Sequence, residues 1–382
     1  MKCFGFKNTR IYIEGKGIVK TSLQIQDGKI SSIGKDESKE LIEFDDSYIV
    51  VPGFIDKHIH GAGKADFMNP SKRQIKKILD SIVKEGTTSC LATTMTQSLD
   101  TLFSSLKVLR DYIEENPKGV EILGIHLEGP FISPKYAGAQ PRDYILPCSV
   151  DIFDKLNKQA GNHIKEVTLA VEENGMDLVK HLVKQNIVAS LGHTDCTYVQ
   201  AKEAVLAGAT SISHMFNAMR GLHHREAGAV GAGLLHKELN CELICDGKHV
   251  LPPVVNLLYQ AKQKTGISLI TDAMEAKWMP DGIYQLGGQE VIVSKGMAKL
   301  KDGTLAGSIL KMNEAIYRFM QITNCSLTDA IDLATINPAN CLHIADKKGS
   351  IAVGKDADLV VIDQKLNVYM TVCRGEIIYS KM

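Results

Sequence analysis

The sequence predicts an α/β fold: a (β/α)8 TIM barrel, with a small β-sandwich domain built from both ends of the chain. Three observations favour this fold. Apolar runs of strand length alternate with helical segments through the middle of the 382-residue chain, a pattern typical of parallel sheets. Eight such runs occur, as in a barrel. The two ends contain short strands and turns instead, and chain termini commonly lie close together.

Both ends of the chain have the pattern of β-structure. Near the N-terminus, residues 11–13 and 22–26 have strand composition, and the following Asp27-Gly28 is a strong hairpin signal. Near the C-terminus, strands are expected at 357–363, 367–372 and 375–379. We therefore expect the small β-sandwich domain to comprise residues 1–50 and 345–382, and the barrel to comprise residues 51–344.

The barrel strands are expected at the apolar runs of the middle region. These runs cover residues 49–55 (extending to 60), 87–94, 121–128, 166–171, 187–193, 210–214, 241–246 and 267–272. Helix-period segments lie between them, for example at 71–84 and 177–185. Such repeated strand and helix units fit a closed barrel better than an open sheet.

The composition excludes several classes of partner. Lys plus Arg equals Asp plus Glu at 44 each, so no net field would attract nucleic acid or an anionic membrane. No stretch approaches the roughly 20 apolar residues of a membrane helix, and the N-terminus has no signal-peptide pattern, so a cytoplasmic protein is expected. Nine scattered cysteines without a CxxC pair indicate reduced thiols.

Histidine and carboxylate side chains gather at the C-terminal ends of the barrel runs, where barrel enzymes place their active sites. They are His58, His60, Glu128, His193, His214 and Asp272. Each can ligate a divalent metal or handle protons beside one. The sequence therefore predicts a site for a divalent metal, either Zn, Fe or Mn, with one or two ions.

The local context supports some of these assignments more than others. Alternation along a strand places His58 and His60 on one face, although such a pair alone could equally be two hydrogen-bonded strand-end histidines. Glu128 precedes Gly-Pro, which ends the strand; a lone acid there could also be a helix N-terminal residue. We interpret His126 as a hydrogen-bonded core residue. The remaining histidines are interpreted as surface or packing residues: His163, His181, His223, His224, His236 and His343.

Asp272 is the best candidate for a general base. A divalent metal acidifies water, and a neighbouring carboxylate can take the proton and deliver it to a leaving amine. Metal contact with a carbonyl oxygen would also stabilise a tetrahedral oxyanion. The arrangement suits the hydrolysis of an amide.

The same residues lie in motifs that resemble the N-acetylglucosamine-6-phosphate deacetylase family of the amidohydrolase superfamily. The motifs are PGFIDKHIHG (52–61), HLEGPF (126–131), GHTD (192–195), HMFNAM (214–219), DGKH (246–249) and LAGS (305–308). The resemblance spans nearly the whole chain. It implies that Glu128, His193 and His214 hold the principal metal, that Asp272 is the catalytic acid/base, and that a second ion could be bridged by Glu128.

The resemblance also implies a pocket for a phosphorylated amino sugar. Its expected lining is Ala139, Gln140, Asn217, Ala218, Arg225, Asp246, Gly247, Lys248, His249, Leu305, Ala306 and Gly307. Equivalents of Arg225 and His249 in this family reach the other subunit, which implies a homodimer. Gln140 departs from the family because many relatives have His there, so this substrate contact would be an amide.

The function implied by the resemblance is deacetylation of N-acetyl-D-glucosamine 6-phosphate in amino-sugar catabolism or recycling. N-acetylgalactosamine-6-phosphate deacetylation is an alternative because the two substrates differ at one hydroxyl. Cyclic-amide hydrolases often bridge their metals with a carbamylated lysine, whereas Glu128 has that place here, and deaminases need no phosphate clamp. A non-catalytic scaffold would be expected to lack metal ligands, and none of the candidates is lost.

Overall fold

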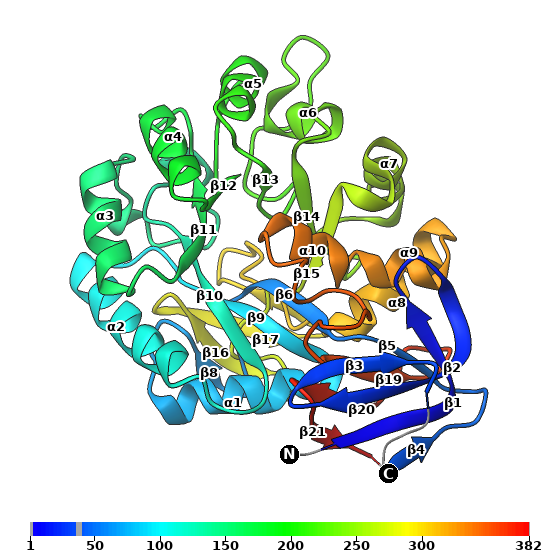
Figure 1. Cartoon of the computed structure of the whole chain (residues 1–382). Coiled ribbons are helices and arrows are strands. Elements are labelled where there is room, and N and C mark those ends of the chain that lie inside the picture. The colour runs from blue at the N-terminus through cyan, green and yellow to red at the C-terminus, as the bar shows by residue number, and fades with distance from the viewer. Residues whose placement is uncertain (1–2, 36–39, 382) are drawn as a thin grey trace.

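The computed structural model describes residues 3–35 and 40–381. Its centre is a barrel of eight parallel strands (Figure 1). In chain order these are β6 (Phe54–Ile59), β9 (Thr87–Thr93), β10 (Glu121–Glu128), β11 (Ile164–Leu169), β12 (Val188–Leu191), β13 (Ser211–Ile212), β14 (Asn240–Ile244) and β15 (Ile267–Ile270). The barrel closes where the backbone N–H of Asp272 donates to His58 O at 2.9 Å and that of His60 donates to Ala273 O at 2.9 Å. The predicted fold class is confirmed.

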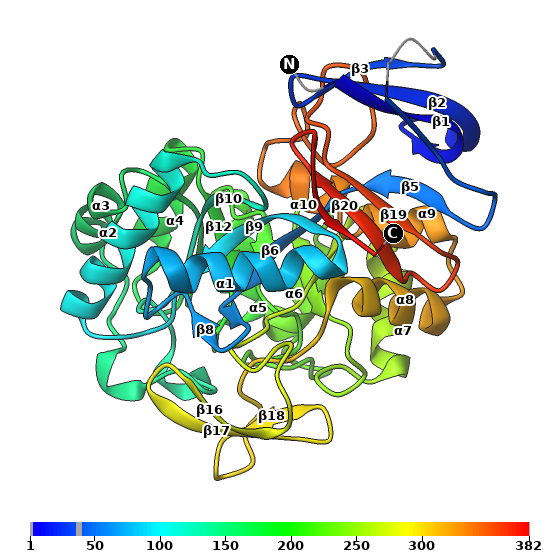
Figure 2. The same ribbon diagram turned by 90° about the horizontal axis from the view of Figure 1, so that it is seen from below.

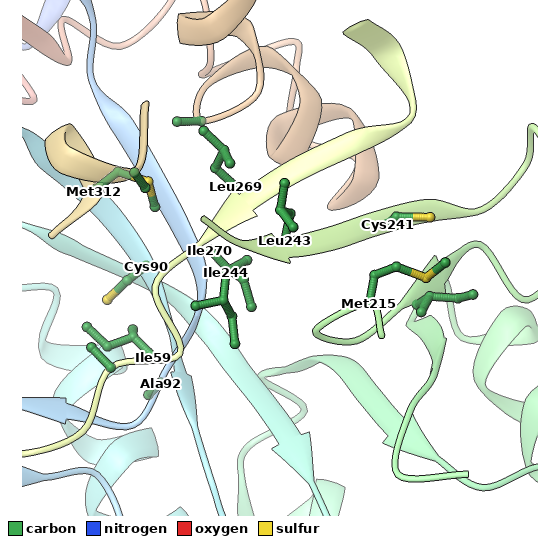
Figure 3. Close-up of a cluster of buried hydrophobic side chains, with 14 of the residues drawn as sticks. Ile59, Cys90, Ala92, Met215, Cys241, Leu243, Ile244, Leu269, Ile270 and Met312 are labelled. Atoms are coloured by element: carbon green, nitrogen blue, oxygen red, sulfur yellow. The ribbon is translucent and has the colours of Figure 1, made fainter. Parts of the chain in front are cut away.

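The strands are apolar because helices cover the outside of the barrel and side chains fill its inside. Figure 3 shows part of the resulting core, in which Ile59, Ala92, Leu243 and Ile270 from different strands lie close together. All four side chains are buried. This rigid core fixes the strand ends, from which the polar side chains described below extend.

Helices follow most of the barrel strands and cover them. They are α1 (Lys72–Ile82), α2 (Leu99–Glu115), α3 (Val150–Gln159), α4 (Met176–Lys184), α5 (Tyr198–Leu206), α6 (Gly228–Leu235), α7 (Pro252–Lys262), α8 (Met312–Thr323), α9 (Leu327–Asp332) and α10 (Ile336–Cys341). The start of α1 illustrates the local signals, since the Ser71 hydroxyl accepts a hydrogen bond from Gln74 N and so caps the helix. No helix in the described part of the chain is long and apolar enough to cross a membrane.

The two ends of the chain form one hydrogen-bonded sheet beside the barrel, and both termini lie there (Figures 1 and 2). Its strands are β1 (Cys3–Ile13), β2 (Gly17–Gln26), β3 (Lys29–Ile33), β4 (Leu41–Glu43), β5 (Ile49–Pro52), β19 (Leu359–Ile362), β20 (Val368–Cys373) and β21 (Glu376–Ser380). Side chains from both ends, such as Phe6, Leu23, Val361 and Met370, share one core. The sheet therefore needs both ends of the chain.

The first apolar run is divided between the two sheets, which differs from the single barrel strand expected at 49–55. Strand β5 pairs with β1 and β19 in the terminal sheet, and β6 starts the barrel after Gly53. A Cβ at Gly53 would lie 2.2 Å from Thr88 Oγ1, so the chain turns there against strand β9 where no larger residue fits. An apolar run cannot by itself show which of two sheets each half joins.

A three-stranded antiparallel sheet was not predicted. It comprises β16 (Gly282–Leu286), β17 (Gln289–Ser294) and β18 (Met297–Lys299), between the last barrel strand and α8. Figure 2 shows it on the side of the barrel opposite the terminal sheet. Its inner side chains, including Leu286 and Val291, pack with Met95 and Met274 from the barrel loops. A short hairpin, β7 (Gly61–Ala62) with β8 (Ala65–Asp66), follows β6.

Candidate active site

The histidines and carboxylates singled out in the sequence meet at the C-terminal mouth of the barrel. His58 lies in β6, and Glu128 ends β10. His193, His214 and Asp272 follow their strands by two residues and have positive φ values of 46°, 31° and 47°. Non-glycine residues rarely adopt this conformation, and it concentrates at functional sites, where the surroundings hold the backbone in place.

Glu128 is at the centre of the group. Its Oε1 lies 3.0 Å from His214 Nε2, 3.3 Å from His193 Nε2 and 3.4 Å from His58 Nε2. Backbone carbonyl groups orient two of the imidazoles through their Nδ1 atoms: His193 Nδ1 is 2.8 Å from Tyr136 O, and His214 Nδ1 is 3.1 Å from Asn217 O. Because carbonyl oxygens only accept hydrogen bonds, each Nδ1 atom carries a proton, and each Nε2 atom faces Glu128.

The second oxygen of Glu128 faces a different set of groups. Its Oε2 lies 3.3 Å from His60 Nε2 and accepts a 2.8 Å hydrogen bond from the Gln140 amide. Thr96 N donates to Gln140 Oε1 at 2.7 Å, which fixes the direction of the amide. In this structure Gln140 therefore orients Glu128, and it also lines the pocket where a substrate contact was expected.

Asp272 lies across the mouth of the barrel beside His58 and His60. Its Oδ1 is 3.2 Å from His60 Nε2 and 3.8 Å from His58 Nε2. Burial opposes ionisation of Asp272, but its hydrogen bond with His60 and the neighbouring His58 hold the pKa of this carboxyl below its usual value. Asp272 is thus placed to act as a base at the floor of the pocket.

The charges of the buried carboxylates at the barrel mouth favour the binding of a cation. Burial alone would raise the pKa of Glu128, but His58, His193 and His214 hold that pKa well below its usual value. Burial lowers the pKa of His60, yet Asp272 and Glu128 outweigh it and raise the pKa to about 9. Two buried, ionised carboxylates therefore attract positive charge to the space between the imidazoles.

The donor set fits a divalent metal. Two groups have the spacing of metal ligands, His58 with His60 and Glu128, and Glu128 with His193 and His214. Buried His58 Nε2 has no hydrogen-bond partner among the described residues. A buried imidazole nitrogen that faces a carboxylate without a hydrogen bond is expected where a metal ion would bind both groups. Imidazole and carboxylate ligands suit Zn, Fe and Mn.

A cavity of about 240 Å³ opens above these groups. Of the residues expected to contact a substrate, the following line it: Ala139, Gln140, Asn217, Ala218, His249, Leu305 and Gly307. His249 lines the pocket of its own chain, where Asp246 Oδ2 holds its Nδ1 at 2.7 Å. This position differs from the expected role of His249 in the site of the other subunit.

The other expected contacts lie outside the cavity of this chain. Arg225 is exposed on the loop between β13 and α6, and its Nη1 lies 2.7 Å from His224 Nε2. Gly247 does not line the cavity, Lys248 Nζ donates to Lys295 O at 3.3 Å, and Ala306 is buried against the three-stranded sheet. His126 is a fully buried core residue, hydrogen-bonded as interpreted from the sequence.

The cavity also has lining residues that the sequence analysis missed. They are Met95, Gly138, Leu286 and Thr304. Leu286 comes from β16, whose segment alternates exposed and buried residues before Gly287-Gly288. This alternation around a two-glycine turn is a hairpin signal that could have identified the additional sheet.

Comparisons with known proteins identify the family of the chain. Residues 49–378 match the amidohydrolase family. The chain is 44% identical to the N-acetylglucosamine-6-phosphate deacetylase of Bacillus subtilis, over 98% of this chain and 96% of that protein. It is 35% identical to an N-acetylgalactosamine-6-phosphate deacetylase of Escherichia coli O157:H7, over 93% and 94% of the two chains.

A solved structure extends the agreement to the fold. The N-acetylglucosamine-6-phosphate deacetylase of Thermotoga maritima superposes with a TM-score of 0.91 at 36% identity, covering 99% of this chain and 100% of that chain. The match includes the terminal sheet as well as the barrel, since almost all of both chains is covered. The chain therefore belongs to the amidohydrolase family, in the group of the N-acetylglucosamine-6-phosphate deacetylases.

Proposed function

We propose that this protein hydrolyses the acetamido bond of N-acetyl-D-glucosamine 6-phosphate, giving D-glucosamine 6-phosphate and acetate, in amino-sugar catabolism or recycling. The observation that carries the proposal is the pocket floor, where Asp272 and Glu128 face a ring of imidazoles at the barrel mouth. The deacetylase relatives, similar over nearly their whole length, support the substrate. A cytoplasmic location stays a prediction.

A divalent metal belongs to this chemistry and would supply a Lewis acid that polarises the acetamido carbonyl and acidifies the attacking water. Glu128, His193 and His214 would hold the principal ion, and His58 with His60 would hold a second one next to Glu128. The shared carboxylate supports this arrangement, because its Oε1 faces His193 and His214 while its Oε2 faces His60.

Asp272 would move the proton of the reaction. As a carboxylate it takes a proton from the attacking water, and it then delivers this proton to the amine nitrogen as the carbon–nitrogen bond breaks. Water adds across the carbon–nitrogen bond, with its hydroxyl going to the acyl carbon and its proton to the nitrogen; this gives the amine and acetic acid, which then loses its proton to the amine or to solvent and leaves as acetate. His60 holds the Asp272 carboxylate in place through the 3.2 Å contact.

We further propose that the active unit is a homodimer and that Arg225 of a second copy closes the phosphate end of the pocket. Arg225 does not line its own cavity, although its loop is next to the site. Exposed apolar side chains on nearby elements support a covered face: Leu206, Leu222, Leu235 and Leu251 are 78%, 57%, 67% and 60% exposed. His249 would contact the phosphate from its own chain.

The galactosamine epimer is the second candidate substrate, favoured by the Escherichia coli relative. Steady-state release of acetate from both N-acetylhexosamine 6-phosphates decides between them, with kcat/KM as the measure. We expect the glucosamine compound to be preferred. A higher kcat/KM for the galactosamine compound would reverse the assignment.

Metal dependence is tested in the same assay. Removing metal with a chelator should abolish hydrolysis while circular dichroism stays nearly unchanged, because the ligands sit at the barrel rim and the core is apolar. Adding back Zn²⁺, Fe²⁺ or Mn²⁺ singly should restore activity and identify the working ion. Undiminished turnover by the metal-free protein would contradict the proposed chemistry, and absence of hydrolysis by the metal-loaded protein would favour a non-catalytic scaffold.

A further inference from the structure

A buried ion cluster lies next to the metal-site histidines and has no role in the chemistry proposed above. Lys57 Nζ is 2.6 Å from Glu166 Oε1 and 2.6 Å from Glu242 Oε1, and all three side chains have zero exposure. Lysine and glutamate are almost never fully buried unless they are paired. Such a costly arrangement inside the barrel calls for an explanation.

Glu242 links this cluster to the metal site. Its Oε2 lies 2.9 Å from His58 Nδ1 and accepts a 3.1 Å hydrogen bond from His214 N. The neighbouring ammonium of Lys57 keeps Glu242 as a carboxylate, which only accepts hydrogen bonds. The Nδ1 atom of His58 must therefore carry the proton.

The other ring nitrogen of His58 faces Glu128. His58 Nε2 is buried, has no hydrogen-bond partner among the described residues and lies 3.4 Å from Glu128 Oε1. A metal-binding histidine commonly has its second nitrogen held by a carboxylate, which fixes the ring orientation and makes the ligand more basic. The contacts of His58 have this form.

The cluster itself is not an additional metal site, although His58, His126 and Glu242 have the spacing of ligands. Lys57 Nζ already lies against Glu242 Oε1. Both ring nitrogens of His126 are engaged, Nδ1 at 3.2 Å from Lys57 O and Nε2 at 2.7 Å from Thr168 Oγ1. A lysine ammonium thus supplies the cation at this position.

We propose that Glu242, held by Lys57, is a positioning residue that fixes the orientation of the His58 ring, with Nε2 directed at the metal beside Glu128. Lys57 keeps Glu242 from turning away, and Glu166 balances the charge of Lys57. The inference rests on the metal site of the proposed function. It adds residues that do not line the pocket.

The substitution Glu242→Gln tests this role in the full-length protein. The side chain keeps its size but loses the charge that holds Lys57 and the Nδ1 proton of His58. Titration of metal-free protein with Zn²⁺ against a competing chelator should show about 10- to 100-fold weaker binding at the site that includes His58. With Co²⁺, the visible spectrum should change as well.

Glu85→Gln is the matched control. Glu85 and Lys277 are also a fully buried ion pair, but neither residue contacts the metal-site histidines. The control should lose stability while keeping the metal affinity and the Co²⁺ spectrum of the wild type. Lys57→Met should weaken metal binding in the same direction as Glu242→Gln. Equal metal affinity in Glu242→Gln and wild type would overturn the proposal.

A measurement on the wild-type chain covers the case in which the variants do not fold. In Zn²⁺-loaded wild-type protein with ¹⁵N-labelled histidine, sequence-specific assignment of the His58 ring should show a protonated Nδ1 and an unprotonated Nε2. A proton on Nε2 would refute the assigned role of Glu242. If the wild type neither bound metal nor released acetate, the proposed function would fail instead, which is a separate outcome.

Discussion

Asp272 combines two properties that a proton carrier needs, a carboxylate kept ionised and a position at the pocket floor. Its Oδ1 contacts His60 at 3.2 Å, and its pKa lies below the usual value despite burial. Asp272→Asn keeps the shape but cannot take a proton. We expect kcat to fall by about 10²-fold or more with metal content unchanged. Stopped-time assays with elemental analysis of the same samples measure both quantities.

One outcome for Asp272→Asn would contradict the proposed role of Asp272 in proton transfer. A metal-loaded variant that turns over at the wild-type rate would assign the proton transfer to another group, such as His193. Ser308→Ala is a useful control because it removes a hydroxyl that donates to Thr271 O, next to Asp272, without removing a proton carrier.

His58 and His60 decide between one ion and two. Both Nε2 atoms lie within 3.4 Å of Glu128, on oxygens Oε1 and Oε2 respectively. The purified protein should carry more than one equivalent of divalent metal, and the double variant His58→Ala, His60→Ala should carry one. Inductively coupled plasma analysis gives the numbers. One equivalent in both proteins would leave the pair with a structural role.

At the level of secondary structure elements, the turn after β10 controls where Glu128 sits. Gly129 has φ +77°, and a Cβ there would lie 2.1 Å from Thr96 Oγ1 and 3.0 Å from Thr96 N. Gly129→Ala should cost about 1–2 kcal/mol for the left-handed backbone and about 1–3 kcal/mol more for the collision. Metal affinity should fall too, because Glu128 is the adjacent residue.

Gly15→Ala separates the two contributions. Gly15 has a similar φ of +72°, but a Cβ there would meet nothing within 4 Å. Urea unfolding should show only the backbone cost for Gly15→Ala, about 1–2 kcal/mol, and normal metal binding. Equal destabilisation by both substitutions would mean that the contact with Thr96 does not matter.

The elements also show what the sequence could and could not reveal. The barrel strands and the polar residues at their ends were predictable, because burial on both faces makes parallel strands apolar and any polar group at their ends conspicuous. The sheet β16–β18 was not predicted because it lies outside the repeating strand and helix units of the barrel. Its alternation of exposed and buried side chains is nevertheless a strand pattern. The division of residues 49–55 at Gly53 depends on contacts with Thr88 and β19, which are distant in sequence.

Some of the pocket contacts were likewise predictable from the sequence, and others were not. Ala139, Asn217 and Leu305 line the cavity as the motifs implied, because the segments that follow β10, β13 and β15 lead to the barrel mouth. The direction of the Gln140 amide depends on Thr96 N and Glu128, and no local pattern encodes it. Arg225 does not line the cavity of its own chain, so its contact with the substrate from a second copy stays a prediction.

At the scale of the whole molecule, Arg225 makes the assembly testable. Arg225→Ala should raise KM for the phosphorylated substrate and barely affect the unphosphorylated sugar, since only the former loses a charge-assisted contact worth about 1.5–3 kcal/mol. Mixing Arg225→Ala and Asp272→Asn subunits should restore part of the activity through hybrid dimers with one intact site.

Lys237→Ala serves as the control for Arg225→Ala, since it removes an exposed cation that does not line the cavity. Equal losses on both sugars would mean that Arg225 shapes the site rather than binds phosphate. No recovery of activity after mixing, with subunit exchange proven by mass spectrometry, would place Arg225 in the pocket of its own chain.

The position of strand β5 has a consequence for biosynthesis. β5 pairs with β1 at a single position but with β19 along its length, from Ile49–Ile362 to Pro52–Leu359. Roughly 300 residues separate the two strands, so a ribosome adding about 5–20 residues per second leaves β5 without its main partner for about 15–60 s. During that interval the nascent chain exposes the unpaired edge of an apolar strand. Pro52 shortens the edge that another chain could pair with, because proline has no backbone N–H to donate. Messages truncated before Leu359 should therefore yield insoluble protein, even though every barrel strand has been translated.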